Sequence, residues 1–270
     1  MGERLLRELR DGVLLLTWNR PERKNAFDDA AWLAFRDALE TARAARDVAV
    51  VVVTGAGGEF SAGVDLHSFR GAVEGPAGAA AATPAGPHPF DLLMQALVAF
   101  DKPLLAAARG VAVGFGATFL FHCDVVYAGQ SLRLRLPFVS LGLVPEAAAS
   151  FLLPAMVGTR RAAELFFTAE WVDAERALAA GIATRVLPDA ELLEGALEKA
   201  REIARWPVSA LQATKQALLR GRSAGVRAAL DTEAELMAKL AGSPENVEAV
   251  VAFLQKRPPD FARFRKPGGS

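Results

Sequence analysis

Apolar positions in the first two thirds of the chain come in short runs separated by polar turns. Residues 13–18 form one such run, and it ends at Asn19-Arg20-Pro21. Residues 48–54 form a second run that, apart from Ala49, is β-branched, which is typical of a strand covered on both faces. The same criteria predict three further strands, over residues 104–113, 123–128 and 132–136.

Helical spacing appears between these runs. Trp32, Phe35 and Leu39 recur at the helical period, and Asp28 and Asp29 before them suit a helix start. A second helix is predicted over residues 92–100. Because strands and helices alternate, we expect an α/β architecture.

After about Thr159 the pattern becomes helical. We expect helices over residues 160–167, 174–180, 190–205, 208–220, 225–240 and 244–255. Val226, Leu230, Met237 and Leu240 mark an apolar stripe on one of them. We therefore predict a core over residues 1–200 and a helical region over residues 201–270 that either caps the core or forms an oligomerisation surface.

Composition narrows the class of protein. The chain has 270 residues, of which 52% are apolar, and its formal net charge is zero. This balance argues against nucleic acid as the main partner, because phosphate binding favours a basic surplus. Cys123 is the single cysteine, so an internal disulfide and a multi-cysteine metal site are excluded. No signal peptide and no membrane-spanning run is predicted, and the expected location is the cytoplasm.

Several other features have ordinary explanations. His67, His88 and His122 are far apart and lack metal-ligand spacing, so no metal site is expected. The segment 71–89 is rich in Gly, Ala and Pro. It is interpreted as a surface loop, with a lid over a site as the alternative.

Two glycine-containing turns follow strands. They are Ser61-Ala62-Gly63-Val64 and Gly114-Phe115-Gly116, and the second opens a helix. Each alone is most simply a tight turn. Small residues also allow a ligand close to the backbone, and N–H groups at a helix start favour negative charge. Together, the two turns make an oxyanion hole plausible.

Glu146 follows Pro145 and precedes three alanines at the start of a predicted helix. It is either a first-turn acid that satisfies the helix dipole or a general base in an apolar pocket, where burial would raise its pKa. A basic cluster, Arg20, Arg23 and Lys24, is either a solvated face or a phosphate site.

Five segments, in this order and with these separations, resemble the enoyl-CoA hydratase/isomerase (crotonase) superfamily over nearly the whole chain. They are residues 19–26, Phe60-Ser61-Ala62-Gly63-Val64-Asp65-Leu66, Lys102-Pro103, residues 110–116 and Cys123-Asp124-Val125-Val126-Tyr127-Ala128. The resemblance implies an α/β fold with a spiral core of ββα units. It also implies C-terminal helices that form trimers or hexamers. The substrate would be an acyl-coenzyme A, and no separate cofactor is implied.

The resemblance also implies roles for individual residues. The backbone N–H groups of Val64 and Phe115 would form the oxyanion hole. The coenzyme A contacts would be Arg23, Ala26, Ala62, Asp65, Leu66 and, from a neighbouring subunit, Lys256. The acyl pocket would be lined or backed by Phe119, Phe138 and Leu143.

Departures from the family pattern bear on the reaction. Hydratases of the superfamily use two glutamates to activate water, and those positions are Thr118 and Phe138 here. Thr is no base near neutrality and Phe forms no such hydrogen bond, so hydratase activity is expected to be negligible. In the Δ3,Δ2-enoyl-CoA isomerases a single acid occupies the position of Glu146. The prediction is therefore an isomerase of unsaturated fatty acyl-CoA with Glu146 as proton shuttle.

Three alternatives remain at this point. The first is an isomerase of a ring-containing acyl-CoA from aromatic degradation, which would use Glu146 in the same way. The second is a non-catalytic acyl-CoA-binding member of the superfamily. The third, an RNA-binding member, is disfavoured by the zero net charge. Acyl chain length and the choice between trimer and hexamer are open.

Overall fold

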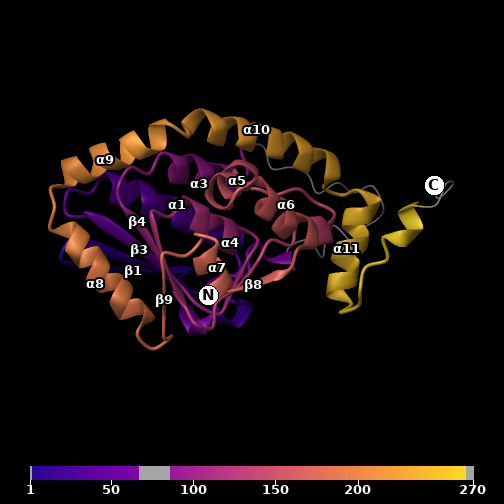
Figure 1. Ribbon diagram of the computed structural model, residues 1–270, viewed down its shortest axis with the longest axis horizontal. Helices are drawn as coiled ribbons and strands as arrows, with labels where there is room; N and C mark the ends of the chain where they lie inside the picture. The colour runs from indigo at the N-terminus through magenta and orange to yellow at the C-terminus, as the bar shows by residue number, and fades with distance from the viewer. Residues whose placement is uncertain (1, 67–85, 266–270) are drawn as a thin grey trace.

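A six-stranded sheet forms the centre of the protein (Figure 1). The computed structural model describes residues 2–66 and 86–265. The strand order is β1-β2-β3-β4-β6-β9; β1 and β2 pair antiparallel and every later neighbour is parallel. The strands are β1 (Leu5–Arg10), β2 (Val13–Trp18), β3 (Val50–Gly55), β4 (Leu104–Ala108), β6 (Val125–Gly129) and β9 (Arg185–Leu187).

A second, three-stranded sheet has the order β5-β7-β8. Its strands are β5 (Val111–Val113), β7 (Arg133–Arg135) and β8 (Trp171–Asp173). A bridge between Ser61 and Ala112 extends this layer. The chain thus visits the large sheet and then the small one in successive turns, at β3 and Ser61, β4 and β5, and β6 and β7. The prediction of one strand over residues 104–113 is wrong, because the chain turns at Gly110, whose φ is 62°, and passes to the other sheet.

Both faces of the large sheet are covered, as the β-branched run predicts. Helices α1 (Asp29–Ala44) and α3 (Pro89–Val98) cover one face, and α8 (Leu192–Ala204) covers the other. Alternate β3 residues divide between the two cores. Val51 and Val53 lie in the larger core with the α1 side chains, whereas Val50 and Val52 pack with α8.

The later helices surround this centre. They are α5 (Ala149–Val157), α6 (Thr159–Thr168), α7 (Ala174–Ala179), α9 (Val208–Arg220), α10 (Ser223–Leu240) and α11 (Pro244–Leu254). Helices α9 and α10 run along one side of the molecule and α11 lies at one end (Figure 1). All six helices predicted after residue 159 are confirmed to within about two residues at each end, whereas α5, β1, β8 and β9 were not predicted.

Two predictions about organisation are not tested by the structure. Residues 71–85 of the predicted loop lie outside the described residues, and α3 already begins at Pro89. The predicted division at residue 200 falls within α8. In the described part of the chain, no helix is long and apolar enough to cross a membrane.

Candidate active site

The first glycine turn is held by a dense set of hydrogen bonds. Ser61 Oγ donates to Asn25 O (2.9 Å) and accepts from Gly63 N (3.1 Å). On the outer side, Phe27 N donates to Gly63 O (2.7 Å) and Asp65 N donates to Phe27 O (2.9 Å). Residues 63 and 65 therefore both pair with Phe27, which leaves the intervening Val64 N–H directed away from that partner. The turn is a fixed structure and not a loose loop.

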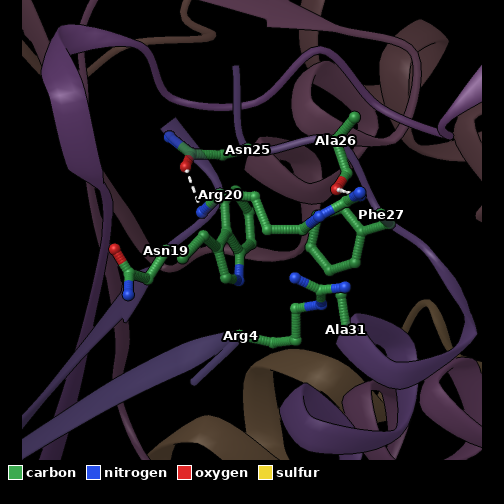
Figure 2. A pocket seen from close by; sticks show the side chains of 8 residues that line it. Arg4, Asn19, Arg20, Asn25, Ala26, Phe27 and Ala31 are labelled. Carbon is green, nitrogen blue, oxygen red and sulfur yellow. Dashed lines mark hydrogen bonds between the residues drawn. The ribbon is translucent and has the colours of Figure 1, made fainter. Parts of the chain in front are cut away.

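The loop before this turn, residues 20–26, is held together by hydrogen bonds around Arg20 (Figure 2). Arg20 is buried, and its guanidinium donates to Ala26 O (2.6 Å) and to Asp65 Oδ2 (3.1 Å). The Arg20 N–H donates to Asn25 Oδ1 (2.9 Å), and Asn25 Nδ2 donates to two backbone carbonyls. The structure thus separates the predicted basic cluster: Arg20 ties residues 20–26 to the first turn, Lys24 pairs with Glu59 at 2.9 Å, and Arg23 is exposed.

The second turn packs directly against the first. A Cβ added to Gly63 would lie 2.5 Å from Val113 O and 3.2 Å from Phe115 N, and a Cβ on Gly116 would lie 2.4 Å from Ser61 O. Only glycine leaves room for this approach. The short helix α4 (Phe115–Thr118) begins at this contact. Within the described residues, neither Val64 N nor Phe115 N has a backbone acceptor. The contact therefore brings two unused N–H groups close together, as an oxyanion hole requires.

Helix α4 also connects this turn to Glu146. Thr118, fully buried at the end of α4, donates from its hydroxyl to Glu146 Oε1 at 2.7 Å. Phe115 and Thr118 are three residues apart in a helix that rises about 1.5 Å per residue. The carboxyl and the Phe115 N–H are consequently linked by one turn of helix and one hydrogen bond.

The Glu146 carboxyl lies in a desolvated position. Its Oε2 is buried and has no hydrogen-bond partner in the described part of the chain. The pKa of Glu146 is raised to about 8, mainly by burial; the charge of Glu233 adds to this rise and the Thr118 hydrogen bond opposes it. A carboxyl with its pKa near neutrality and one free oxygen can accept and return a proton.

Glu146 does not lie in the first turn of a helix. Helix α5 begins three residues later, at Ala149. The two residues between, Ala147 and Ala148, both have left-handed backbone conformations, with φ of 60° and 57°. Such conformations cost roughly 1–2 kcal/mol for each residue with a Cβ. The helix-dipole interpretation of Glu146 is therefore not supported by its position, and the strain is of the kind that clusters at functional sites.

The three residues predicted to line or back the acyl pocket lie in two places. Phe138 is buried and its carbonyl accepts from Leu143 N (2.9 Å), so these two lie together on the segment that leads to Glu146. Phe119 is fully buried among the rings of Trp18, Phe35, Phe60 and Phe115, so it backs the site from the core.

The predicted coenzyme contacts lie mostly at the first turn. Ala26 and Asp65 are buried, and Ala62 and Leu66 are partly exposed beside them. Ala62 N donates to Lys24 O (2.8 Å). Lys256 is exposed and follows α11, the helix at one end of the molecule (Figure 1). A role for it in a partner's site stays a prediction.

Sequence reasoning missed two groups that contact the Glu146 segment. His122 Nε2 donates to Ala147 O (2.8 Å), and burial lowers the pKa of His122 to about 4, so the ring is neutral at pH 7. Glu233 of α10 accepts from Ala148 N (2.7 Å) and Ser150 N (2.8 Å). A signal for Glu233 existed, because it interrupts the apolar stripe of Val226, Leu230, Met237 and Leu240 at helical spacing.

Over residues 2–66 and 86–265, no group of three or more His, Cys, Asp or Glu side chains is arranged to hold a metal ion. What the two turns and the Glu146 segment supply is a buried acid and two N–H groups. Such a set can stabilise an enolate and move a proton.

Comparison with known proteins identifies the family. A sequence profile described as enoyl-CoA hydratase/isomerase matches residues 8–264. The chain is 39% identical over 249 residues to the 2,3-dehydroadipyl-CoA hydratase of Escherichia coli (strain K12), covering 92% of this chain and 94% of that protein. It is 33% identical over 270 residues to the 1,2-epoxyphenylacetyl-CoA isomerase of the same organism, covering 97% and 99%.

A solved structure agrees with the sequence matches. The crystal structure of an enoyl-CoA hydratase/isomerase from Pseudoalteromonas atlantica T6c has a TM-score of 0.88 at 35% identity, covering 96% of this chain and 100% of that one. The predicted spiral core with C-terminal helices is thereby confirmed. The chain belongs to the enoyl-CoA hydratase/isomerase family.

Proposed function

We propose that the protein is an acyl-CoA isomerase that moves a double bond from C3 to C2 of an enoyl-CoA. The observation that carries this proposal is the buried carboxyl of Glu146, held by Thr118 one helical turn from Phe115 N. The acyl-CoA substrate is consistent with the family.

The proposed reaction needs one carboxyl group, Glu146, and two N–H donors, those of Val64 and Phe115. The thioester oxygen of a 3-enoyl-CoA accepts hydrogen bonds from the N–H groups of Val64 and Phe115. Ionised Glu146 removes a proton from C2, and the electrons delocalise over C2, C3, C4 and the thioester oxygen. Glu146 then returns the proton to C4, which leaves the double bond between C2 and C3. No water is consumed, so one acid is sufficient.

The residues around Glu146 support isomerisation over hydration. Thr118 is engaged as a donor to Glu146 Oε1, and Phe138 offers no side-chain hydrogen-bonding group. A water molecule would therefore have no second carboxylate to orient it. The hydratase among the relatives is named for its own reaction, and Thr118 and Phe138 are the positions at which this chain departs from the hydratase pattern.

A ring-containing acyl-CoA is the second candidate substrate. The support for it is the similarity to a protein named 1,2-epoxyphenylacetyl-CoA isomerase, a name that describes a ring-containing acyl-CoA. Glu146 would act as the base in the same way. Turnover of straight-chain 3-enoyl-CoA compared with ring-containing acyl-CoA separates the two substrates.

The first test is the conversion of a 3-enoyl-CoA to the trans-2-enoyl-CoA by wild type and by Glu146→Gln. The substitution keeps the shape of the side chain but removes its ability to take up a proton. We expect the wild type to turn over and the variant to lose about 10²- to 10⁴-fold in kcat. Glu191→Gln, at an exposed acid before α8, is the matched control and should retain full activity.

Other results would contradict the proposal in different ways. Equal activity of both proteins would show that Glu146 is not the base. A wild type that binds acyl-CoA tightly but turns over no 3-enoyl or ring-containing substrate would favour a non-catalytic binding protein. Rapid formation of 3-hydroxyacyl-CoA from trans-2-enoyl-CoA would show hydration despite Thr118 and Phe138.

A further inference from the structure

Glu146 is carried by a backbone segment that is unfavourable on its own. Ala147 and Ala148 are both left-handed, and neither is glycine. An ordinary backbone at these two residues would redirect the Glu146 side chain, because φ and ψ at Ala147 and Ala148 set the angle between residue 146 and α5. Something in the surrounding structure must therefore hold the pair.

Hydrogen bonds from other elements hold each residue of this segment. Thr118 of α4 holds the Glu146 carboxyl, and His122 donates to Ala147 O. Glu233 accepts from Ala148 N with one carboxylate oxygen and from Ser150 N with the other. Both acceptors therefore belong to one carboxyl group, which caps the N-terminus of α5. Burial raises the pKa of Glu233, and the hydrogen bonds from Ser150 and Ala148 oppose this rise.

Glu233 is placed for this role by the packing of α10. It is 5% exposed and lies on the same face as the buried residues Val226 and Ala229. This face packs on α5, and Gly225 allows the approach, since a Cβ there would lie 2.3 Å from the ring of Phe151. A buried carboxylate is costly unless its oxygens are satisfied, and both oxygens of Glu233 are used on the Glu146 segment.

The same segment is held at its other end by α11. Asn246 Nδ2 donates to Leu141 O (2.8 Å), and a Cβ on Gly142 would lie 3.0 Å from Asn246 N. Residues 141–150, with Glu146 in the middle, thus rest on two C-terminal helices. These helices, expected to serve oligomerisation, also support the site within their own chain.

We propose that Glu233 is a positioning residue for the reaction: from α10 it fixes the left-handed turn Ala147–Ala148 and so aims the Glu146 carboxyl. This inference rests on the proposed function, in which Glu146 is the base. The Glu233 carboxyl bonds to the backbone N–H groups of Ala148 and Ser150, so it acts on Glu146 through the turn and through its charge.

The charge of Glu233 provides a second readout. Among the described residues, three side-chain groups from packed elements bond to residues 146–150: the Thr118 hydroxyl from α4, the neutral His122 ring and the Glu233 carboxyl from α10. Arg222 and Lys215 act on His122. Of these groups, Glu233 raises the pKa of Glu146 by charge repulsion, whereas Thr118 lowers it. Removing the Glu233 charge should therefore lower the pKa of Glu146.

The experiment compares Glu233→Gln, Glu233→Asp and Glu235→Gln with wild type. Glu235 is an exposed acid on the same helix that pairs with Lys239, so its variant controls for charge and helix propensity. For each protein, kcat and KM for 3-enoyl-CoA are measured over pH, and the pKa of Glu146 is obtained independently by carboxyl carbon NMR with Glu146→Gln as the assignment standard.

Glu233→Gln should lower kcat by about 10- to 100-fold, as expected for a misplaced catalytic group, with KM changed by less than about 2-fold. The pKa of Glu146 should move to lower pH. Glu233→Asp keeps the charge but shortens the reach, so it should lower kcat while leaving that pKa near the wild-type value. Glu235→Gln should match wild type. An unchanged kcat and an unchanged Glu146 pKa in Glu233→Gln would overturn the proposal.

A rescue experiment tests the turn itself. Glycine adopts left-handed backbone without strain, so Ala148→Gly should restore part of kcat in the Glu233→Gln background without restoring the pKa of Glu146. Failure to restore any activity would overturn the argument through the turn. If the wild type is inert with every enoyl-CoA, the proposed function fails, whereas the NMR comparison still decides whether Glu233 controls Glu146.

Discussion

The Glu146 carboxyl is subject to opposing influences from its surroundings. Burial and the Glu233 charge favour its protonated form, and the Thr118 hydroxyl favours the ionised form. The balance leaves a pKa of about 8. An ordinary surface glutamate would be a weaker base by several orders of magnitude, so the environment and not the residue type makes the proton transfer feasible.

This raised pKa makes stability depend on pH. The unfolded carboxyl ionises near pH 4.5 and the folded one near pH 8, so between these values the folded state keeps a proton that the unfolded state has released. The free energy of unfolding contributed by Glu146 is full below about pH 4.5. It falls as pH rises through this window, by up to about 1.4 kcal/mol per pH unit.

Glu146→Gln should abolish this dependence. Its stability relative to wild type should therefore increase between about pH 5 and pH 8, measured by guanidinium unfolding at a fixed protein concentration. A wild type and a variant with parallel pH dependences would contradict the raised pKa.

Thr118→Val tests the hydrogen bond at the same carboxyl. The change keeps the shape of the side chain but removes the donor to Glu146 Oε1. Because this bond lowers the pKa of Glu146, its loss should raise the pKa and move the rise of kcat/KM to higher pH. Thr118→Ser keeps the hydroxyl and should stay close to wild type. A shift to lower pH in Thr118→Val would show that the bond plays no such part.

At this scale the sequence indicates residue types better than contacts. Glu146 and the two glycine turns stand out because their letters match a family pattern, and Thr118 stands out because it departs from one. The partners of Ala147 and Ala148 do not, since His122 and Glu233 lie 25 and 85 residues from the atoms that they bind. Left-handed φ at two alanines also has no letter pattern, because the surrounding contacts impose it.

At the scale of elements, the function depends on how closely two turns approach. Ser61 Oγ fixes the first turn, and Gly116 lets α4 begin against it. Helix α4 has only four residues, so its position comes from its contacts and not from its own stability.

Gly116→Ala should disturb this approach. Its Cβ would lie 2.4 Å from Ser61 O, so the turns must separate. We expect about a 10²-fold loss of kcat, comparable to the loss of an oxyanion donor, and a loss of stability of about 1–3 kcal/mol. Gly221→Ala is the matched control, because nothing lies within 4 Å of its added Cβ. Full activity in Gly116→Ala would contradict the proposed oxyanion hole.

A comparison of the predicted and observed boundaries of helices and strands shows where the local sequence pattern is enough to predict them. Long amphipathic helices such as α8 follow their periodicity closely, because one buried face, with Leu192, Ala196 and Ala200, dictates the spacing. The run 104–113 is predicted as one strand, since every residue fits a buried strand except Arg109 and Gly110. Its division between two sheets depends on the pairing of Ser61 with Ala112. The three-residue strands β8 and β9 carry too few positions for a period to appear.

At the scale of the whole molecule, several large apolar side chains lie on the surface. Phe167 of α6 is 77% exposed and Leu218 of α9 is 71% exposed, with Trp206 and Phe253 also more than half exposed. Exposed aromatic and aliphatic side chains of this size commonly mark protein interfaces. They are consistent with the predicted trimer or hexamer, which stays a prediction.

The oligomer can be tested by light scattering on the purified protein. We expect the mass of three or six chains for wild type and smaller species for Phe167→Glu and Leu218→Glu, because a charge buried in an interface is costly. A monomeric wild type at micromolar concentration would contradict the prediction.

The hydrogen bonds from Ala148 N and Ser150 N to Glu233 also have a consequence for the order of events during synthesis. A ribosome releases residues 146–150, and later the last described strand, β9, before it releases residue 233. At that stage the emerging chain lacks the acceptor for these two N–H groups. The left-handed turn can become permanent only when α10 docks. A chain that ends before α10 would lack the Glu233 carboxyl that accepts from Ala148 N and Ser150 N.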